Sequence, residues 1–145
     1  MAENENVTIV QETGKGKFNQ EIKVGKHVLV GDEPVANGGN DLGPSPYDFL
    51  LAALGTCTSM TVRYYADFKK IPLSKVSVSL THEKKYAQDC ADCEKSDAKI
   101  DHIERKITLE GDLSEEQRKK LLEVANKCPV HKTLTSTVKI STELL

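Results

Sequence analysis

The chain has 145 residues, with 20 Lys and Arg against 22 Asp and Glu and a formal net charge of −2. Hydrophobic residues make up 38% and charged residues 29%, a balance that excludes a disordered chain. The near-neutral charge gives no reason to expect nucleic acid or an acidic membrane as a partner. A chain of this length buries roughly 70% of its unfolded surface. No repeat or linker interrupts it, so we expect a single domain over residues 1–145.

The N-terminal sequence MAENENVTIV has no basic stretch followed by an apolar run, so it does not have the pattern of a signal peptide. The most apolar stretch, residues 47–68, is interrupted by Asp48, Arg63 and Asp67, which favours a buried helix over a membrane span. We therefore expect a cytoplasmic protein.

The first third of the chain is predicted to form short antiparallel strands. Partial alternation and turn residues place them at 7–11, 18–24 and 27–30. A loop rich in Gly, Pro, Asn and Asp follows at residues 31–44. Its glycines lack the spacing of a phosphate-binding loop, so we interpret it as a connector.

A long helix is expected from Ser45 to about Lys70. Ser45 can cap it, Pro46 suits the first helical position, and Asp48 completes a capping box while complementing the helix dipole. The helix body is apolar almost all round, which predicts burial by neighbours on several sides.

The second half is predicted to contain two paired strands, a helix and a final strand. Residues 76–80 alternate between apolar and polar, and a partner strand is predicted at 103–109. Ser114 and Gln117 form a second capping box that opens the helix. A strand at 138–140 closes the chain. The fold class is therefore α+β with antiparallel sheet.

Four cysteines fall into two pairs, and without a secretion signal such cysteines are more often reactive or metal-bound than structural. Cys57 lies in the middle of the long helix. Cys128 precedes Pro129, so it is predicted to cap a short helix, where partial positive charge favours a thiolate. His131 offers a proton acceptor or a positive charge. The alternative for either thiol is a small core residue.

The segment GGNDLGPSPYDFLLAALGTCTSMTVRYYA resembles the central helix motif of the OsmC/Ohr family, the osmotically inducible protein C and organic hydroperoxide resistance proteins. The segment LLEVANKCPVHKTL resembles the second motif of that family. The resemblance runs from about Val7 to Leu144 and is closest to the OsmC-like branch. It implies a two-layer α+β fold that forms an intertwined homodimer, with Cys57 on a buried central helix.

This resemblance also implies a thiol-dependent peroxidase that reduces organic hydroperoxides in an oxidative stress response. By position, Cys57 is then the peroxidatic cysteine, which becomes a sulfenic acid. Cys128 is the resolving cysteine, which forms a disulfide with it. The implied partners are a hydroperoxide substrate and an external dithiol reductant of the lipoyl type, with no bound cofactor.

One departure from the family concerns the positive charge beside the reactive cysteine. The resemblance implies an arginine from the N-terminal strands, yet no arginine precedes Cys57 in this chain. A lysine lacks the forked geometry of arginine. The candidates for a supporting role are Asp48, Tyr47, Lys17 and His131. For Asp48, the alternative is a purely capping role.

Three further residues of the long helix, Met60, Tyr64 and Tyr65, are candidates for a substrate pocket. The two tyrosines return to the side of the helix that carries Cys57. The alternative is that they pack in the core, as aromatic residues of buried helices usually do.

Cys90 and Cys93 have the spacing of half a zinc site, and His82 and His102 lie on the flanking strands. The alternative is an acidic loop with two exposed thiols, and we expect no bound zinc. Two other functions stay open. One is a non-catalytic protein that binds a small hydrophobic ligand at the dimer interface, and the other is a metal or redox sensor that uses Cys90 and Cys93.

Overall fold

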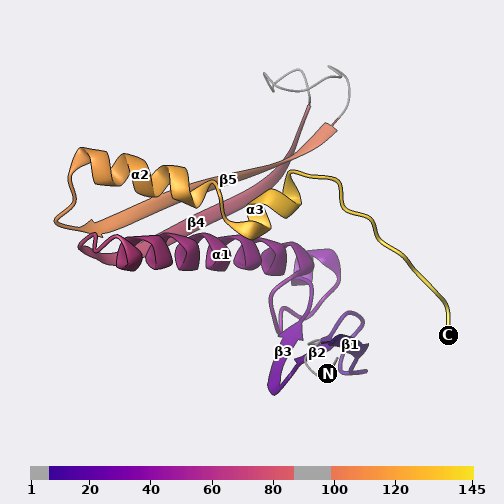
Figure 1. Cartoon of the computed structure of the whole chain (residues 1–145). Helices are drawn as coiled ribbons and strands as arrows, with labels where there is room; N and C mark the ends of the chain where they lie inside the picture. Colours follow the sequence, from indigo (N-terminus) through magenta and orange to yellow (C-terminus); the bar gives the residue numbers. More distant parts are fainter. Residues whose placement is uncertain (1–6, 87–98) are drawn as a thin grey trace. The chain divides into compact units, whose positions relative to one another are not determined.

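Two compact units make up the chain, one up to Leu50 and the other from Leu51 onward. The structure is a computed structural model that describes residues 7–86 and 99–145 (Figure 1). The chain contains helices and antiparallel strands, in agreement with the α+β class that the sequence predicts. Among the described residues, no helix is both long and apolar enough to cross a membrane.

The first unit contains a three-stranded antiparallel sheet with the strand order β1-β2-β3. The strands are β1 (Thr8–Glu12), β2 (Gln20–Val24) and β3 (His27–Gly31). Their pairing is continuous, with Val10 opposite Ile22 and Ile22 opposite Leu29. The three predicted strands are therefore confirmed.

The loop after β3 is organised around a buried carboxylate. Asp32 is 3% exposed and accepts hydrogen bonds from the backbone N–H groups of Glu33 at 2.8 Å and Leu42 at 3.2 Å. A short 3₁₀ helix, η2 (Val35–Asn37), lies within the loop. Gly39 passes so close to the chain that an added Cβ would lie 2.0 Å from the carbonyl oxygen of Glu33. The connector predicted from the sequence thus has a fixed shape.

The long helix, α1 (Pro46–Phe68), begins where the capping residues predict. The backbone N–H of Ser45 donates to Asp48 Oδ2 at 3.0 Å, and the N–H of Asp48 donates to Ser45 Oγ at 3.3 Å. This reciprocal pair satisfies two N–H groups that no helical carbonyl can reach. The capping role of Asp48 is confirmed.

Only one face of α1 is buried within a single chain, although the sequence predicts burial on several sides. Met60, Tyr64 and Phe68 follow one another at helical spacing, and they are 66%, 75% and 70% exposed. The buried face comprises Leu54, Gly55, Thr58, Val62 and Ala66.

The second unit places α1 and α2 (Glu115–Ala125) along a long antiparallel hairpin (Figure 1). The hairpin consists of β4 (Leu73–Tyr86) and β5 (Lys99–Gly111), which extend well beyond the predicted strands. The core cluster joins α1, β4 and α2 through the buried residues Val62, Ala66, Leu73, Leu121 and Ala125.

A glycine lets α1 approach the hairpin closely. A Cβ at Gly55 would lie 2.7 Å from Leu80 Cδ1 of β4, which is closer than real side-chain contacts. Because Gly55 has no side chain, the part of α1 that carries Cys57 can lie close to the face of β4 that includes Leu80.

The chain ends with a short helix, α3 (Pro129–Leu134), and a segment without regular secondary structure. The strand predicted at 138–140 is wrong for the single chain, where Val138 is 57% and Ile140 is 83% exposed. An alternating pattern forms a strand only where a neighbouring strand edge accepts its hydrogen bonds.

Candidate functional site

Cys128 is held at the start of α3, where the sequence predicts it. Its backbone is extended, with φ −64° and ψ 143°, and its side chain caps the helix. The backbone N–H of His131 donates to Cys128 Sγ at 3.3 Å. The residue is completely buried, at 0% exposure. The first N–H groups of a helix have no carbonyl partner within the helix, and here Cys128 Sγ accepts from one of them. Such a hydrogen bond favours the thiolate form of a cysteine.

Cys57 lies beside Cys128, although the two are far apart in the sequence. The Cys57 side chain is close enough to Cys128 to help lower the pKa of the Cys128 thiol, and Oγ1 of the adjacent Thr58 lies 3.7 Å from Cys128 Sγ. Both cysteines are free thiols, and Cys57 is half-buried where Cys128 is fully enclosed. The two thiols that the resemblance pairs are therefore neighbours in the structure, with Cys57 the more accessible one.

Thr58, the residue after Cys57, connects Cys128 to a positive charge. Its side chain is completely buried, and its Oγ1 lies 3.7 Å from Cys128 Sγ. Arg105 Nη1 donates to the same oxygen at 2.9 Å. The one hydroxyl proton can go either to the carbonyl oxygen of Leu54, at 2.7 Å, or to the sulfur.

Arg105 comes from β5 and faces the helices because of the strand register. It lies opposite Leu80 of β4 and two residues from Ile107, which lies opposite Val78. Its Nη2 donates to Asn126 Oδ1 at 2.8 Å and to His131 Nδ1 at 2.9 Å. The guanidinium group thus joins α1, α2 and α3 on the inner face of the hairpin.

The side chain of His131 is neutral. Burial and the nearby charge of Arg105 both lower its pKa. Since Nδ1 accepts from Arg105, the ring proton is on Nε2. Of the two roles that the sequence leaves open for His131, the geometry favours the acceptor, directed at the arginine. The residue contacts Cys128 through its backbone N–H.

The net effect of these neighbours is a Cys128 that ionises readily. Burial alone raises the pKa of the Cys128 thiol, because it penalises the charged form. Hydrogen bonds from the His131 backbone and from the Thr58 and Cys57 side chains, together with the charge of Arg105, outweigh burial and lower this pKa below its usual value. These neighbours therefore favour the thiolate form of Cys128.

A cavity of about 420 Å³ lies against the same residues. Arg105 and His131 form one part of its wall, next to Asn126. The remaining wall combines the polar residues Asp101 and Thr135 with five apolar residues, Leu54, Ile103, Ile107, Leu122 and Leu134. The cavity therefore offers a site with an apolar part for a small molecule, beside residues that contact Cys128.

The other supporting candidates have local contacts of their own. Asp48 forms the capping box with Ser45. Tyr47 is 50% exposed. The ammonium group of Lys17 lies over the Phe18 ring, 5.0 Å from its centre. All of these residues lie in the first unit, whereas both thiols lie in the second.

The three candidates for a substrate pocket differ in their surroundings. Tyr65 packs against the core cluster, in agreement with the alternative of core packing. Tyr64 is exposed, and Met60 lines a shallow depression together with Gly55 and Leu80. None of the three lines the cavity beside Arg105.

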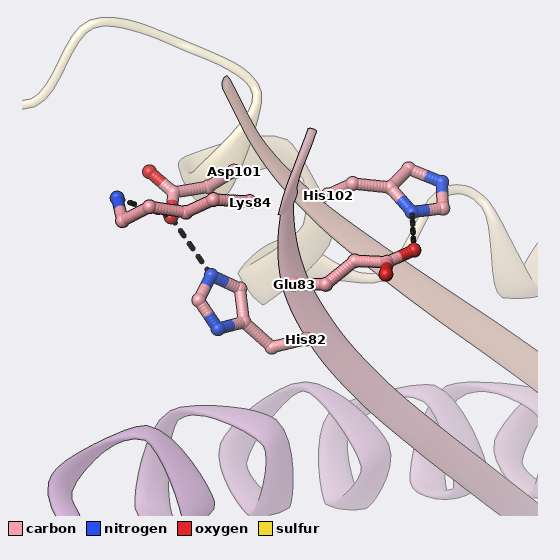
Figure 2. A network of polar contacts seen from close by, with 5 residues as sticks. All are labelled: His82, Glu83, Lys84, Asp101 and His102. Carbon is pink, nitrogen blue, oxygen red and sulfur yellow. Dashed lines mark hydrogen bonds and ion pairs between the residues drawn. The ribbon is translucent and has the colours of Figure 1, made fainter. Parts of the chain in front are cut away.

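The proposed histidine ligands of the second cysteine pair point to opposite faces of the hairpin (Figure 2). On one face His82 Nε2 lies 2.8 Å from Asp101 Oδ1, which Lys84 also contacts at 3.0 Å. On the other face, His102 Nδ1 lies 3.7 Å from Glu83 Oε1. Opposite faces of one ribbon cannot direct both imidazoles at one ion. Cys90 and Cys93 lie outside the described residues.

Arg105, Thr58 and Asn126 are the site residues that sequence reasoning missed. A signal for Arg105 was present, because it occupies the inward position in the alternating row that includes Ile103 and Ile107. A charged residue at a core-facing position of a strand indicates a buried polar partner. No sequence signal pointed to the other two.

Comparisons with known proteins identify the family and the fold of the chain. The family model described as OsmC-like protein matches residues 38–143. The crystal structure of an OsmC-like protein from Mycoplasma pneumoniae has a TM-score of 0.68 at 19% identity, covering 90% of this chain and 87% of that chain. No curated protein sequence matches the chain.

Two further solved structures belong to organic hydroperoxide resistance proteins. The one from Legionella pneumophila has a TM-score of 0.63 at 21% identity, and 89% of each chain is covered. The one from Elizabethkingia anophelis, with thiocyanate bound, has a TM-score of 0.62 at 18% identity, covering 90% of this chain and 91% of that chain. At these identities the likeness demonstrates a shared fold. The family match spans most of the chain and includes both Cys57 and Cys128, and the chain belongs to the OsmC-like protein family.

Proposed function

We propose that the protein is a thiol-dependent peroxidase that reduces organic hydroperoxides to alcohols with Cys57 and Cys128 as its redox couple. The observation that carries this proposal is the proximity of the two thiols, one accessible and one buried. A disulfide requires only that two such sulfurs move together. Family membership and the hydroperoxide resistance proteins of the same fold support the reaction class.

The reaction begins at Cys57, the more accessible sulfur. Its thiolate attacks the distal peroxide oxygen, the O–O bond breaks, and the alkoxide takes up a proton and leaves as an alcohol. Cys57 is oxidised by two electrons to a sulfenic acid. The thiolate of Cys128 then attacks the Cys57 sulfur, water leaves, and the disulfide forms.

An external dithiol closes the cycle, and we propose one of the lipoyl type. It attacks a sulfur of the disulfide, and access decides which sulfur is attacked. Cys128 is completely buried and Cys57 is half-buried, so Cys57 is the sulfur that the reductant attacks.

The cavity beside Arg105 and His131 supports a preference for organic peroxides over hydrogen peroxide. Its volume of about 420 Å³ and its leucine and isoleucine wall suit a small apolar group. Hydrogen peroxide gains nothing from such a wall, because it has no apolar surface to bury.

We also propose that the protein acts as a homodimer. Met60, Tyr64 and Phe68 leave an apolar stripe of α1 exposed in the single chain. Val138 and Ile140 are also exposed, and they belong to a segment that alternates like a strand but pairs with no strand of the described chain. A second copy would bury the stripe and could supply the missing edge.

Mass spectrometry of the reduced protein after a brief, stoichiometric exposure to cumene hydroperoxide tests the proposed reaction. We expect a rapid Cys57–Cys128 disulfide, formed faster than with hydrogen peroxide. Cys57→Ser should abolish peroxide consumption, and Cys128→Ser should leave a trapped sulfenic acid on Cys57. Unchanged thiols in the parent protein would refute the proposal.

A second candidate function is the binding of a small hydrophobic ligand without catalysis. The observation that favours it is a cavity of about 600 Å³ within the first unit, with Val10, Phe18, Ile22, Leu29 and Phe49 in its wall. In that case, apolar ligands would raise the thermal stability of both the parent protein and Cys57→Ser, and neither protein would consume the ligand.

A further inference from the structure

Arg105 carries a positive charge and is half-buried. Within the described part of the chain, its guanidinium group donates hydrogen bonds to neutral acceptors. These acceptors are Thr58 Oγ1, Asn126 Oδ1 and His131 Nδ1, at 2.8–2.9 Å. Within residues 7–86 and 99–145, no ion pair joins Arg105 to a carboxylate. A charge held away from water by neutral groups requires an opposite charge nearby.

The carboxylate of Asp101 lines the same cavity, but it is paired with His82 and Lys84. The negative charge that is linked to Arg105 through Thr58 is the thiolate of Cys128. Thr58 Oγ1 contacts both Arg105 and Cys128 Sγ, so a single buried oxygen links the two groups. The backbone N–H of His131 in α3 also donates to Cys128 Sγ. Two elements, α1 and α3, thus contact this sulfur, and both also contact the arginine.

We propose that Arg105 is the positioning residue of the thiol pair and that it holds the single negative charge of Cys57 and Cys128 on Cys128 in the resting protein. The proposal rests on the peroxidase function above. It adds the proton path that this function needs, because Cys57 is the accessible thiol and Cys128 is the ionised one.

The proton path is balanced within the pair. The Cys128 thiolate takes the proton of the Cys57 thiol, and Cys57 attacks the organic hydroperoxide. The departing alkoxide takes that proton and leaves as an alcohol, which returns Cys128 to its thiolate. Cys128 then attacks the sulfenic acid of Cys57, and the hydroxide that leaves becomes water by taking one proton from solvent. Arg105 contacts no reacting atom and acts through Thr58 and its charge.

Thiol ionisation tests this inference without any peroxide. The full chain with Cys90→Ser and Cys93→Ser is titrated by the ultraviolet absorbance of the thiolate. We expect one thiolate per chain with a midpoint below that of an ordinary thiol. Arg105→Gln should raise the midpoint by about one pH unit or more, because a positive charge at this range stabilises the anion.

Two variants separate the charge of Arg105 from its geometry. Arg105→Lys keeps the charge but not the forked donors, so its midpoint should lie between those of the parent and Arg105→Gln. Arg118→Gln is the matched control, because the recorded hydrogen bond of Arg118 goes to the carbonyl oxygen of Leu109, away from both thiols. Its midpoint should equal that of the parent.

Replacing each cysteine in turn locates the charge. Cys57→Ser should keep the low midpoint, whereas Cys128→Ser should lose it. A low midpoint that persists in Cys128→Ser would assign the charge to Cys57 and overturn the inference.

An Arg105→Gln protein that folds, as judged by circular dichroism, and titrates like the parent would also overturn the inference. If Arg105→Gln does not fold, Arg105→Lys decides in the same way. A parent protein that consumes no peroxide yet shows these shifts would refute the peroxidase and leave the role of Arg105 intact.

Discussion

Replacing Thr58 with valine removes the oxygen that links Arg105 to Cys128 while keeping the shape of the side chain. Thr56 provides a matched control on the same helix. Each hydroxyl donates to the carbonyl oxygen four residues earlier, at 2.7 Å for Thr58 and 2.6 Å for Thr56. Only Thr58 also accepts from Arg105. The difference between Thr58→Val and Thr56→Val therefore measures the contacts of Thr58 with Arg105 and Cys128, and the Arg105→Gln background separates the two.

The expected loss of stability follows from two opposing contributions. A hydrogen bond from a charged donor contributes about 1.5–3 kcal/mol. Thr58 is completely buried, so the added methyl group returns about 0.8 kcal/mol. We expect Thr58→Val to lower the free energy of unfolding by about 1–2 kcal/mol more than Thr56→Val does.

Urea denaturation followed by far-ultraviolet circular dichroism measures this difference, since the chain has no tryptophan. A domain of this size loses about 1–3 kcal/mol of stability per molar urea, so the midpoint should fall by about 0.5–1 M. All variants are compared at one protein concentration, because a homodimer unfolds in a concentration-dependent way. In an Arg105→Gln background the extra cost of Thr58→Val should disappear. Equal midpoints for the two threonine variants would refute the reasoning.

Three other outcomes are expected. Leu121→Ala empties a completely buried position of the core cluster and should cost about 2–5 kcal/mol in urea unfolding, whereas the same change at the half-exposed Leu122 should cost much less. Burial opposes ionisation of Asp32, but hydrogen bonds from the loop outweigh burial and lower the pKa of Asp32. The ionised carboxylate therefore stabilises the fold above the usual aspartate pKa, and this stabilisation is lost as the pH falls through the lowered pKa. The free energy of unfolding of Asp32→Asn should depend less on pH below about pH 4 than that of the parent protein. The pKa of His131 is also lowered, by burial and by Arg105, so its imidazole should titrate by NMR below about pH 6.5 in the parent and closer to that value in Arg105→Gln; a His131 signal that titrates at the usual pH would show that the ring is not enclosed as described.

Several features of the fold could be predicted from neighbouring residues alone. The capping box of Ser45 and Asp48 fixed the start of α1, and Pro129 identified Cys128 as a helix cap. These features depend on contacts within three or four residues, so the local sequence contains all the partners that they need.

The alternation of residues also predicted the strands, but it did not predict which strand edges would be available. The hairpin strands pair with each other over their whole length because both carry the pattern. Residues 138–140 carry the same pattern and form no strand in the single chain, because a strand needs a second edge that its own sequence does not encode.

The thiol site divides in the same way. The sequence determined that Cys57 and Cys128 are the thiols of interest and that Cys128 caps a helix. Only the tertiary structure decided that Arg105 of β5 provides a positive charge beside them. The physical reason is that the register of β4 and β5 directs the Arg105 side chain toward α1. Gly55 lets α1 lie close to β4, and Arg105 forms its hydrogen bond with Thr58 of the same helix. Both depend on residues of β4 and β5 that are far from the two cysteines in the sequence.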